Sequence, residues 1–427
     1  MTTHSDASRR SVRASPRDKA YEANIWKSYA FQFLLSFQLW WPIWVIYLTD
    51  MRGFSLTQVS GLEALFWVVI VVAEVPTGAI ADRFGRKVSL MLGAACTTAA
   101  ILVFGIATDY WVVLVSYVAW GIGLTFQSGA DSALVFESLK AVGRERDYQR
   151  VAGVGWGIFS VGTLAGMLAG APIAAATDLA FPILISSAIA FMALLVAATM
   201  KEPELARDEV RLGYRALIAE SARTAWRLPA VRTMLVLSAV LMASTNASFI
   251  FAQPFLHAHD VSTQMLGVAQ SPMRLGGIVG ALLAYRAAGA FGMRTTLVAA
   301  ATVIGVSYAV IGAWDSVFAF AALAPVTLMS YMMLPIVANY LNVRIPNSQR
   351  ATILSIRQLL FGIIIAVIQP GLGLLADIVS LEAVFLVSAL LVAVTAPIGL
   401  FLWSRADAQD GSVLEPAQEL EATPAGG

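Results

Sequence analysis

Twelve apolar stretches, each long enough to span a lipid bilayer, recur along the 427-residue chain and constrain its fold more than any other feature. An α-helix needs about 20 apolar residues to cross a hydrocarbon core of ~30 Å. The composition agrees, because 58% of the residues are hydrophobic and 13% charged, against about 45–50% and roughly 25% in soluble domains. The sequence therefore predicts an all-α membrane protein of twelve transmembrane helices. The predicted spans are 29–49, 58–80, 88–107, 111–138, 151–176, 179–200, 231–256, 264–285, 293–313, 316–341, 351–376 and 379–403.

The basic residues fall on one side of this arrangement. If the N-terminus is cytoplasmic, every Lys and Arg except Arg52 and Arg274 lies in or beside a cytoplasmic segment. Cytoplasmic loops of membrane proteins carry an excess of these residues. We therefore expect a multi-pass protein of the inner (plasma) membrane with both termini in the cytoplasm. The net charge of +1 does not indicate nucleic-acid binding, and no nucleic-acid partner is expected.

The chain divides into two similar halves. Gln149-Arg150 recurs as Gln349-Arg350, and Gly78-Ala79 recurs as Gly280-Ala281. Six spans per half place both halves in the same orientation, which is typical of parallel repeats with a substrate site between them near the midplane. The predicted parts are a cytoplasmic N-terminal segment at 1–28, a six-helix bundle at 29–200, a cytoplasmic linker at 201–229, a second six-helix bundle at 230–404 and a disordered cytoplasmic tail at 405–427.

The loop after the second predicted helix reads Gly78-Ala-Ile-Ala-Asp82-Arg83-Phe-Gly85-Arg86-Lys87. It resembles the G-x-x-x-D-R-x-G-R-[RK] signature of the major facilitator superfamily, and the preceding Glu74-Val-Pro-Thr extends the match. In that family the loop is a conformational latch between the halves; the alternative is a loop that serves only solubility and topology. Physically, Gly78 would let two helices meet closely and Gly85 would permit a tight turn. The resemblance implies the gating role for Gly78, Asp82, Arg83, Gly85 and Arg86.

A second pattern lies in the fifth predicted helix. Gly162, Gly166, Gly170 and Pro172 resemble the Gly/Pro pattern of exporters in the same family. Small residues every four positions also favour close helix packing. In the fourth helix, Tyr117 stands where the exporter pattern has an arginine.

Ionisable residues within the predicted spans are candidates for transport, because a charge at mid-bilayer costs roughly 2.5–3.5 kcal/mol or more. In this family the first, fourth, seventh and tenth helices line the central cavity, and Asp131 is the only acid well inside them. We expect Asp131 to carry a coupling proton or to contact a cationic substrate; the alternative is a static ion pair with an arginine such as Arg357. Arg274 is expected either to bind an anionic group of the substrate or to pair with Glu63 or Asp131.

Further candidates are weaker. Glu63 is a second transport candidate, whereas Glu74 is expected to belong to the latch and Glu137 to lie at the inner interface. The aromatic residues of the first helix could form a wall for an organic substrate. The remaining polar candidates for substrate or proton binding are Gln127, Asn246 and Asn339.

These features favour a secondary active transporter that works by alternating access. Proton coupling is expected, because carboxyl groups removed from water can exchange a proton near neutral pH. Export of small organic compounds is the first choice, and proton-coupled uptake of a metabolite, anionic if Arg274 binds it, is the alternative. The chain has no G-x-x-x-x-G-K-[ST] pattern, so ATP is not expected as the direct energy source. A monomer that uses a small-molecule substrate, an ion gradient and the bilayer is expected, without enzyme activity, metal or other cofactor.

Overall fold

The computed structural model describes residues 16–203, 223, 225–345 and 349–421. The described residues are nearly all helical and contain no β-strand. Eleven helical segments are long and apolar enough to cross a membrane. In the first half they are α3 (Leu56–Phe84), α4 (Arg86–Ile106), α5 (Tyr110–Gln127) with α6 (Ala130–Ala141), α7 (Tyr148–Ala176) and α8 (Phe181–Thr199). In the second half they are α10 (Pro229–Ala247) with η3 (Phe249–Phe251) and α11 (Ala252–Ala258), η4 (Thr263–Met265) with α12 (Leu266–Phe291), α13 (Met293–Ala313), η5 (Val317–Ala322) with α14 (Leu323–Arg344), α15 (Arg350–Ile378) and α16 (Leu381–Glu421).

The first predicted span is built as a broken helix. α1 runs over Pro16–Ser36, so it begins well before residue 29, and the chain resumes in α2 (Trp44–Ile46) and a π-helical turn, η1 (Tyr47–Met51). We call residues 37–43 the break segment. Its polar groups find partners outside a helix: the Leu39 N–H donates to Ser186 Oγ at 2.9 Å, and Pro42 has no N–H to donate. The apolar run at 29–49 predicted a continuous helix, and the structure corrects that prediction.

The chain ends also differ from prediction. α1 occupies part of the segment 1–28, which was predicted to precede the first bundle. α16 remains helical to Glu421, where a disordered tail was predicted from residue 405. Most of the predicted linker at 201–229 lies outside the described residues, as do 1–15 and 422–427.

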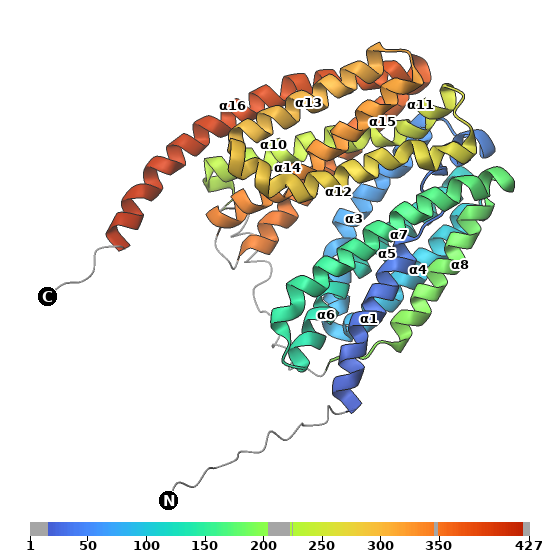
Figure 1. Cartoon of the computed structure of the whole chain (residues 1–427), viewed down its shortest axis with the longest axis horizontal. Coiled ribbons are helices and arrows are strands. Elements are labelled where there is room, and N and C mark those ends of the chain that lie inside the picture. The colour runs from blue at the N-terminus through green and yellow to red at the C-terminus, as the bar shows by residue number, and fades with distance from the viewer. Residues whose placement is uncertain (1–15, 204–222, 224, 346–348, 422–427) are drawn as a thin grey trace, which may run out of the picture.

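The same helix pairs pack in both halves. α4 packs on α8 as α13 packs on α16, α3 on α5 as α12 on α14, and α1 on α7 as α10 on α15. Figure 1 shows the two bundles meeting at one end and diverging at the other, where both termini project. The main contacts between halves are α3 with α15 and α7 with α12. We call the two ends the closed end and the open end.

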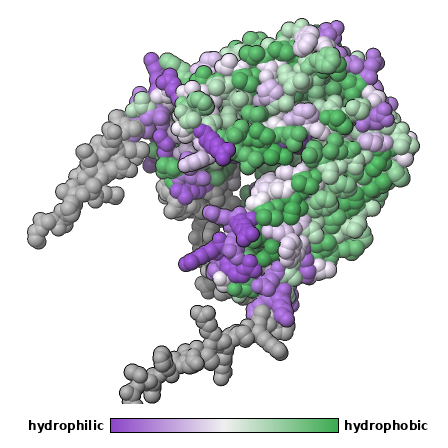
Figure 2. All heavy atoms as spheres, in the orientation of Figure 1, coloured by the Kyte–Doolittle hydropathy of each residue, from purple (hydrophilic) through white to green (hydrophobic). Residues whose placement is uncertain are grey.

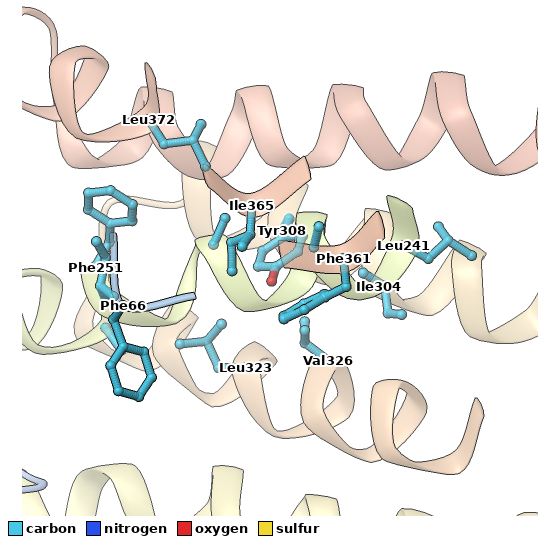
Figure 3. Close-up of a cluster of buried hydrophobic side chains, with 14 of the residues drawn as sticks. Phe66, Leu241, Phe251, Ile304, Tyr308, Leu323, Val326, Phe361, Ile365 and Leu372 are labelled. Atoms are coloured by element: carbon cyan, nitrogen blue, oxygen red, sulfur yellow. The ribbon is translucent and has the colours of Figure 1, made fainter. Parts of the chain in front are cut away.

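Apolar side chains fill both bundles and also cover them. The largest buried cluster extends through both halves, and Figure 3 shows part of it, with Phe361 and Ile365 of α15 near Tyr308 of α13. Large apolar side chains are exposed as well, such as Leu282 at 74% and Val367 at 73%. Figure 2 shows hydrophobic residues over most of the visible face, with hydrophilic ones gathered mainly toward its ends. A surface of this kind fits a lipid environment.

Candidate functional site

The candidate site is the region between the halves, and its closed end is held by polar contacts across them. Asp377, near the end of α15, accepts hydrogen bonds from the N–H groups of Leu56 at 3.0 Å and Thr57 at 2.8 Å, and from Thr57 Oγ1 at 2.6 Å. These groups form the N-terminus of α3, where a carboxylate is favoured by unpaired N–H groups and the helix dipole. His257 of α11 faces Asp50 of η1, with Nε2 and Oδ2 3.1 Å apart. Two polar contacts, Asp377 with the start of α3 and His257 with Asp50, therefore join the halves at the closed end.

Two glutamines of the second half bind the backbone in and beside the break segment. Gln253 of α11 accepts from the Val45 N–H at 2.9 Å and donates to the Trp41 carbonyl at 2.8 Å. Gln270 of α12 donates to the Pro42 carbonyl at 3.0 Å. Backbone groups released from helical bonding need such partners when they are away from water. The break in the first helix thus supplies a seal between the halves, which we call the glutamine seal.

The glycines of α7 face the first helix and its break segment. A Cβ on Gly162 would meet the side chain of Ser36, one on Gly166 would lie 2.8 Å from the Gln38 carbonyl oxygen, and one on Gly170 would overlap the Leu39 carbonyl. Pro172 lies in the same helix, two residues after Gly170. Only glycine permits so close a backbone approach at these positions.

Below the glutamine seal, toward the open end, a row of aromatic rings in the first half leads to one ring of the second half. Trp41 lies 6.4 Å from Trp120, Trp120 stacks on Phe66 at 4.4 Å, and Phe66 contacts Trp67 at 5.6 Å. Trp67 meets Phe361 of the second half at 4.8 Å. We call Trp41, Trp120, Phe66, Trp67 and Phe361 the aromatic wall. It reaches from the break segment to α15 and so involves both halves.

Arg274 lies at one end of this wall. Its guanidinium carbon is 5.1 Å from the centre of the Trp41 ring. Among the residues that the structure describes, no carboxylate lies within 4.0 Å of it, so the predicted pairing with Glu63 or Asp131 is not made. A cation–π contact contributes about 0.5–2 kcal/mol, whereas a charge at mid-bilayer costs roughly 2.5–3.5 kcal/mol or more. The ring therefore offsets only part of the cost of this charge.

Asp131 lies at the start of α6, directly after a break at Gly129, which has a φ of 72°. Its two oxygens accept hydrogen bonds from Ser28 Oγ at 2.7 Å and Gln32 Nε2 at 2.6 Å, both on α1. These bonds replace the ion pair with Arg357 that the sequence allowed. The Asp131 carboxyl on α6 is therefore held against α1 by two neutral donors. In this arrangement it can take up a proton without breaking an ion pair.

The signature loop joins α3 and α4 near the open end. Gly85 has a φ of 104°, and a Cβ there would lie 2.8 Å from Oε1 of Glu202. The Glu202 carboxylate accepts from the N–H groups of Arg86 at 2.8 Å and Lys87 at 2.7 Å, and so caps α4. Arg86 bonds Asp82 at 2.7 Å in its own half.

Around this loop the remaining contacts are looser. The Arg86 guanidinium lies 3.6 Å from Glu137, and the Arg83 guanidinium lies over the Phe84 ring at 5.4 Å. A Cβ on Gly78 would meet no atom within 4 Å, so the close helix approach predicted there is not made in this conformation. Glu74 is exposed and accepts only a long bond, at 3.4 Å, from Ser128.

The other predicted site residues are not brought together. Gln127 donates to Thr97 at 3.0 Å inside the first half, away from the wall. Asn246 is half-buried on α10, and Asn339 is exposed on α14. Arg357 borders a small cavity with Ser238 and Met242, and its Nη1 is buried without a partner. Glu63 is half-buried on α3, close enough to Tyr117 for an electrostatic interaction.

Several residues of the site were not predicted from the sequence. Ser28 and Gln32 lay at or near the edge of the predicted first span, and their helical spacing of four was the one hint of a shared face. Glu202 accepts from backbone N–H groups of α4, Asp377 accepts from those of α3, and Gln270 donates to a carbonyl of the break segment. A side chain that binds a peptide group has no partner residue type that a sequence pattern could reveal, so these contacts could not be predicted.

Comparison with known proteins agrees with this architecture. The family described as Major Facilitator Superfamily matches residues 29–283. A nucleoside transporter, NupG, superposes with a TM-score of 0.77 at 12% identity, covering 90% of this chain and 99% of that one. A bacterial homologue of the human lysosomal transporter Spinster, solved in an inward-facing and unoccupied conformation, superposes with a TM-score of 0.67 at 17% identity, covering 93% and 98%. None of the curated proteins compared matches the sequence. The chain belongs to the Major Facilitator Superfamily, and its twelve-helix fold is that of a membrane transporter.

Proposed function

We propose that the protein is a secondary active transporter that exports small organic compounds in exchange for protons by alternating access. The observation that carries this proposal is the asymmetry of the space between the halves. It is latched at one end by Asp377 and by the glutamine seal, and the bundles diverge at the other. Rocking of two similar bundles about a central site is how parallel-repeat transporters exchange access.

We place the protein in the inner membrane with both termini in the cytoplasm, acting as a monomer without enzyme activity. The distribution of Lys and Arg supports this topology. With it, the open end faces the cytoplasm and the conformation is inward-open. The pairing of Asp82 with Arg86 within one half suits a latch that is released in this conformation and re-forms across the halves when the open end closes.

Asp131 is our candidate for the proton site. It lies on α6 and faces α1, and it is bound by hydroxyl and amide donors rather than by a cation. Protonation would weaken those bonds and loosen α1 from α6. Glu63 is the second carboxyl placed to take part.

Transport by the purified protein in proteoliposomes, with an imposed pH gradient and a panel of compounds, tests the proposal. Nucleosides belong in the panel because NupG is named a nucleoside transporter. We expect at least one organic compound to move against its gradient when protons flow the opposite way. Flux that is indifferent to the pH gradient would remove proton coupling. Absence of flux for the whole panel, with protein-free liposomes as the baseline, would count against transport of organic compounds.

Proton-coupled uptake of an anionic metabolite is the second candidate, and the unpaired Arg274 favours it. The same vesicles separate the two directions. In an exporter, substrate and protons move in opposite directions, whereas in a symporter an inward proton gradient drives accumulation of the substrate on the same side as the protons.

A further inference from the structure

We propose that the substrate is an organic anion with a planar aromatic group, and that Arg274 binds the anionic group while the aromatic wall holds the ring. This inference rests on the proposed transport function and names the substrate class of the same site. It applies to export and to uptake alike.

The first support is the contrast between Arg274 and those arginines of the described chain that have a polar partner; Arg357, whose Nη1 is also buried without a partner, borders a different cavity, with Ser238 and Met242. Arg86, Arg144 and Arg344 each face a carboxylate within 4.0 Å. Arg52, the other arginine outside the basic segments, bonds the Tyr47 hydroxyl and the Gly105 carbonyl, both at 2.9 Å. Arg274 lies over the Trp41 ring, and within the described residues no carboxylate lies within 4.0 Å of it. Arg274 is a half-buried cation whose hydrogen-bond donors are available to a ligand.

The second support is where Arg274 lies. Gln270 is four residues earlier on α12, so the two side chains share a helix face one turn apart. Gln270 forms part of the glutamine seal, and Arg274 therefore lies directly on its open-end side, over Trp41. An anion bound here would lie beside the glutamine seal and the Trp41 ring.

The third support is the continuity of the aromatic wall. From Trp41 it passes through Trp120, Phe66 and Trp67 to Phe361, with ring centres 4.4 to 6.4 Å apart. Trp41, Trp67 and Trp120 are only partly buried, so ring faces remain for a ligand. Offset or edge-to-face contact with such rings favours planar aromatic groups. The fixed guanidinium fork favours a carboxylate or similar planar anion.

A cationic substrate would lack a matching partner at this point. Arg274 would repel it, and Asp131 already accepts two hydrogen bonds between α1 and α6. Glu63 is the carboxyl that could attract it, and the test includes a cation for that reason. An anion, in contrast, would join Arg274 of the second half to rings of the first, so that binding would involve both bundles.

Binding of three probes with one ring system tests the proposal: 2-naphthoate, 2-naphthamide and protonated 2-naphthylmethylamine. Isothermal titration to the purified full-length chain in lipid nanodiscs measures each affinity. We expect the carboxylate to bind more tightly than the amide by about tenfold or more, because charge-assisted bonds are the strong ones. Arg274→Gln should remove that preference, and Arg274→Lys should keep part of it. Arg294→Gln, at an exposed arginine outside the site, is the matched control and should change nothing.

Several results would overturn the proposal. Equal affinities for carboxylate and amide would do so, as would a preference that survives Arg274→Gln, tighter binding of the amine, or no naphthoate binding at millimolar concentration. Thermal melting of each variant shows whether it is folded, and Arg274→Lys retains the charge if Arg274→Gln does not fold. If a non-anionic compound is transported while the naphthoate preference is absent, only this inference fails. If the preference is present and no compound is transported, the proposed function fails and the binding site stands.

Discussion

The two halves share a packing plan but carry opposite charges inside the membrane. The first half contributes acids, with Glu63, Asp131 and Glu137 in its helices, whereas the second contributes Arg274 and Arg357. Asp131 and Glu137 have close partners in their own half, and Arg274 has no carboxylate beside it within the described residues. The common packing supplies the frame, and the chemistry comes from residues that the repeat does not share.

The loops that correspond in the two halves show the same division. Phe84-Gly85 and Phe291-Gly292 each end one long helix and start the next, with positive φ values of 104° and 75° at the glycines. Gly85 is packed against Glu202, whereas a Cβ on Gly292 would meet nothing within 4 Å. The turn geometry is repeated, but the carboxylate packed against the glycine of the first loop has no counterpart at Gly292 among the described residues.

The sharpest way to break this comparison is to neutralise the acid of the first half. We expect Asp131→Asn to lower pH-driven transport by about tenfold or more, because an amide cannot take up the proton that the carboxyl would carry through the membrane. Uptake into proteoliposomes with and without a pH gradient measures it. Glu145→Gln, at an exposed acid in the short 3-10 helix η2 (Glu145–Asp147) outside the site, serves as the control. Undiminished gradient-driven transport by Asp131→Asn would place the proton site elsewhere.

The closed-end latch tests whether the halves move as bodies. Asp377→Ala removes three hydrogen bonds to the start of α3, and we expect the latched state to lose about 1.5–3 kcal/mol. The distance between spin labels at positions 51 and 379, on a Cys96→Ser background, measures the separation of the halves at the closed end. We expect the Asp377→Ala variant to have a larger fraction of molecules at the longer distance than the parent protein. Asp315→Ala removes an acid whose partner, His259, lies in the same half, and should leave the distances unchanged. Identical distance distributions for both variants would mean that Asp377 does not hold the closed end.

The glycines of α7 sharpen the comparison, because they support a helix break that belongs to the first half. Gly170→Ala would overlap the Leu39 backbone, and we expect a loss of about 1–3 kcal/mol in stability, as for other overpacked positions. Gly157→Ala in the same helix meets no atom within 4 Å and is the matched control. Thermal unfolding in detergent compares the two; an equal melting temperature would mean that the break segment yields at little cost.

The smallest effect is expected at the signature loop. Glu202→Gln weakens the cap on α4, and we expect a loss of about 0.5–1 kcal/mol. Thermal unfolding, with Glu145→Gln as the neutral reference, measures it. If Glu202→Gln is as stable as the reference, the carboxylate charge adds nothing to the cap, and the two corresponding loops are more alike than their surroundings indicate.

The sequence predicted the fold well because the hydrocarbon core imposes a length and polarity on every span. It did not predict the break after Ser36, since the apolar run continues through Leu39 and Ile43. Nor did it predict that α1 extends back to Pro16, because the helix there is polar and is stabilised by partners such as Ser138, which accepts from Asn24 at 2.9 Å. Lipid exposure can be predicted from composition, but contact between helices requires knowing which faces meet.

The candidate site was predicted in its ionisable residues and in the aromatic residues of the first helix, which include Trp41. Asp131 and Arg274 were found because charge is rare in a membrane, but the contacts that they make with Gln32 and Trp41 were not predicted, since the sequence does not show which helix faces meet. Charge alone suggested that an acid would pair with an arginine. Instead, Asp131 binds a hydroxyl and an amide, and Arg274 lies over an aromatic ring.

The glutamine seal has a consequence for water. Its acceptors are the carbonyls of Trp41 and Pro42 and its donors include the Val45 N–H, all held by Gln253 and Gln270 of the opposite half. When the closed end opens, these peptide groups must be hydrated, because lipid offers them no hydrogen bonds. Opening is then a wetting event, and solutes excluded from the protein surface, such as sucrose, should favour the closed end by lowering water activity.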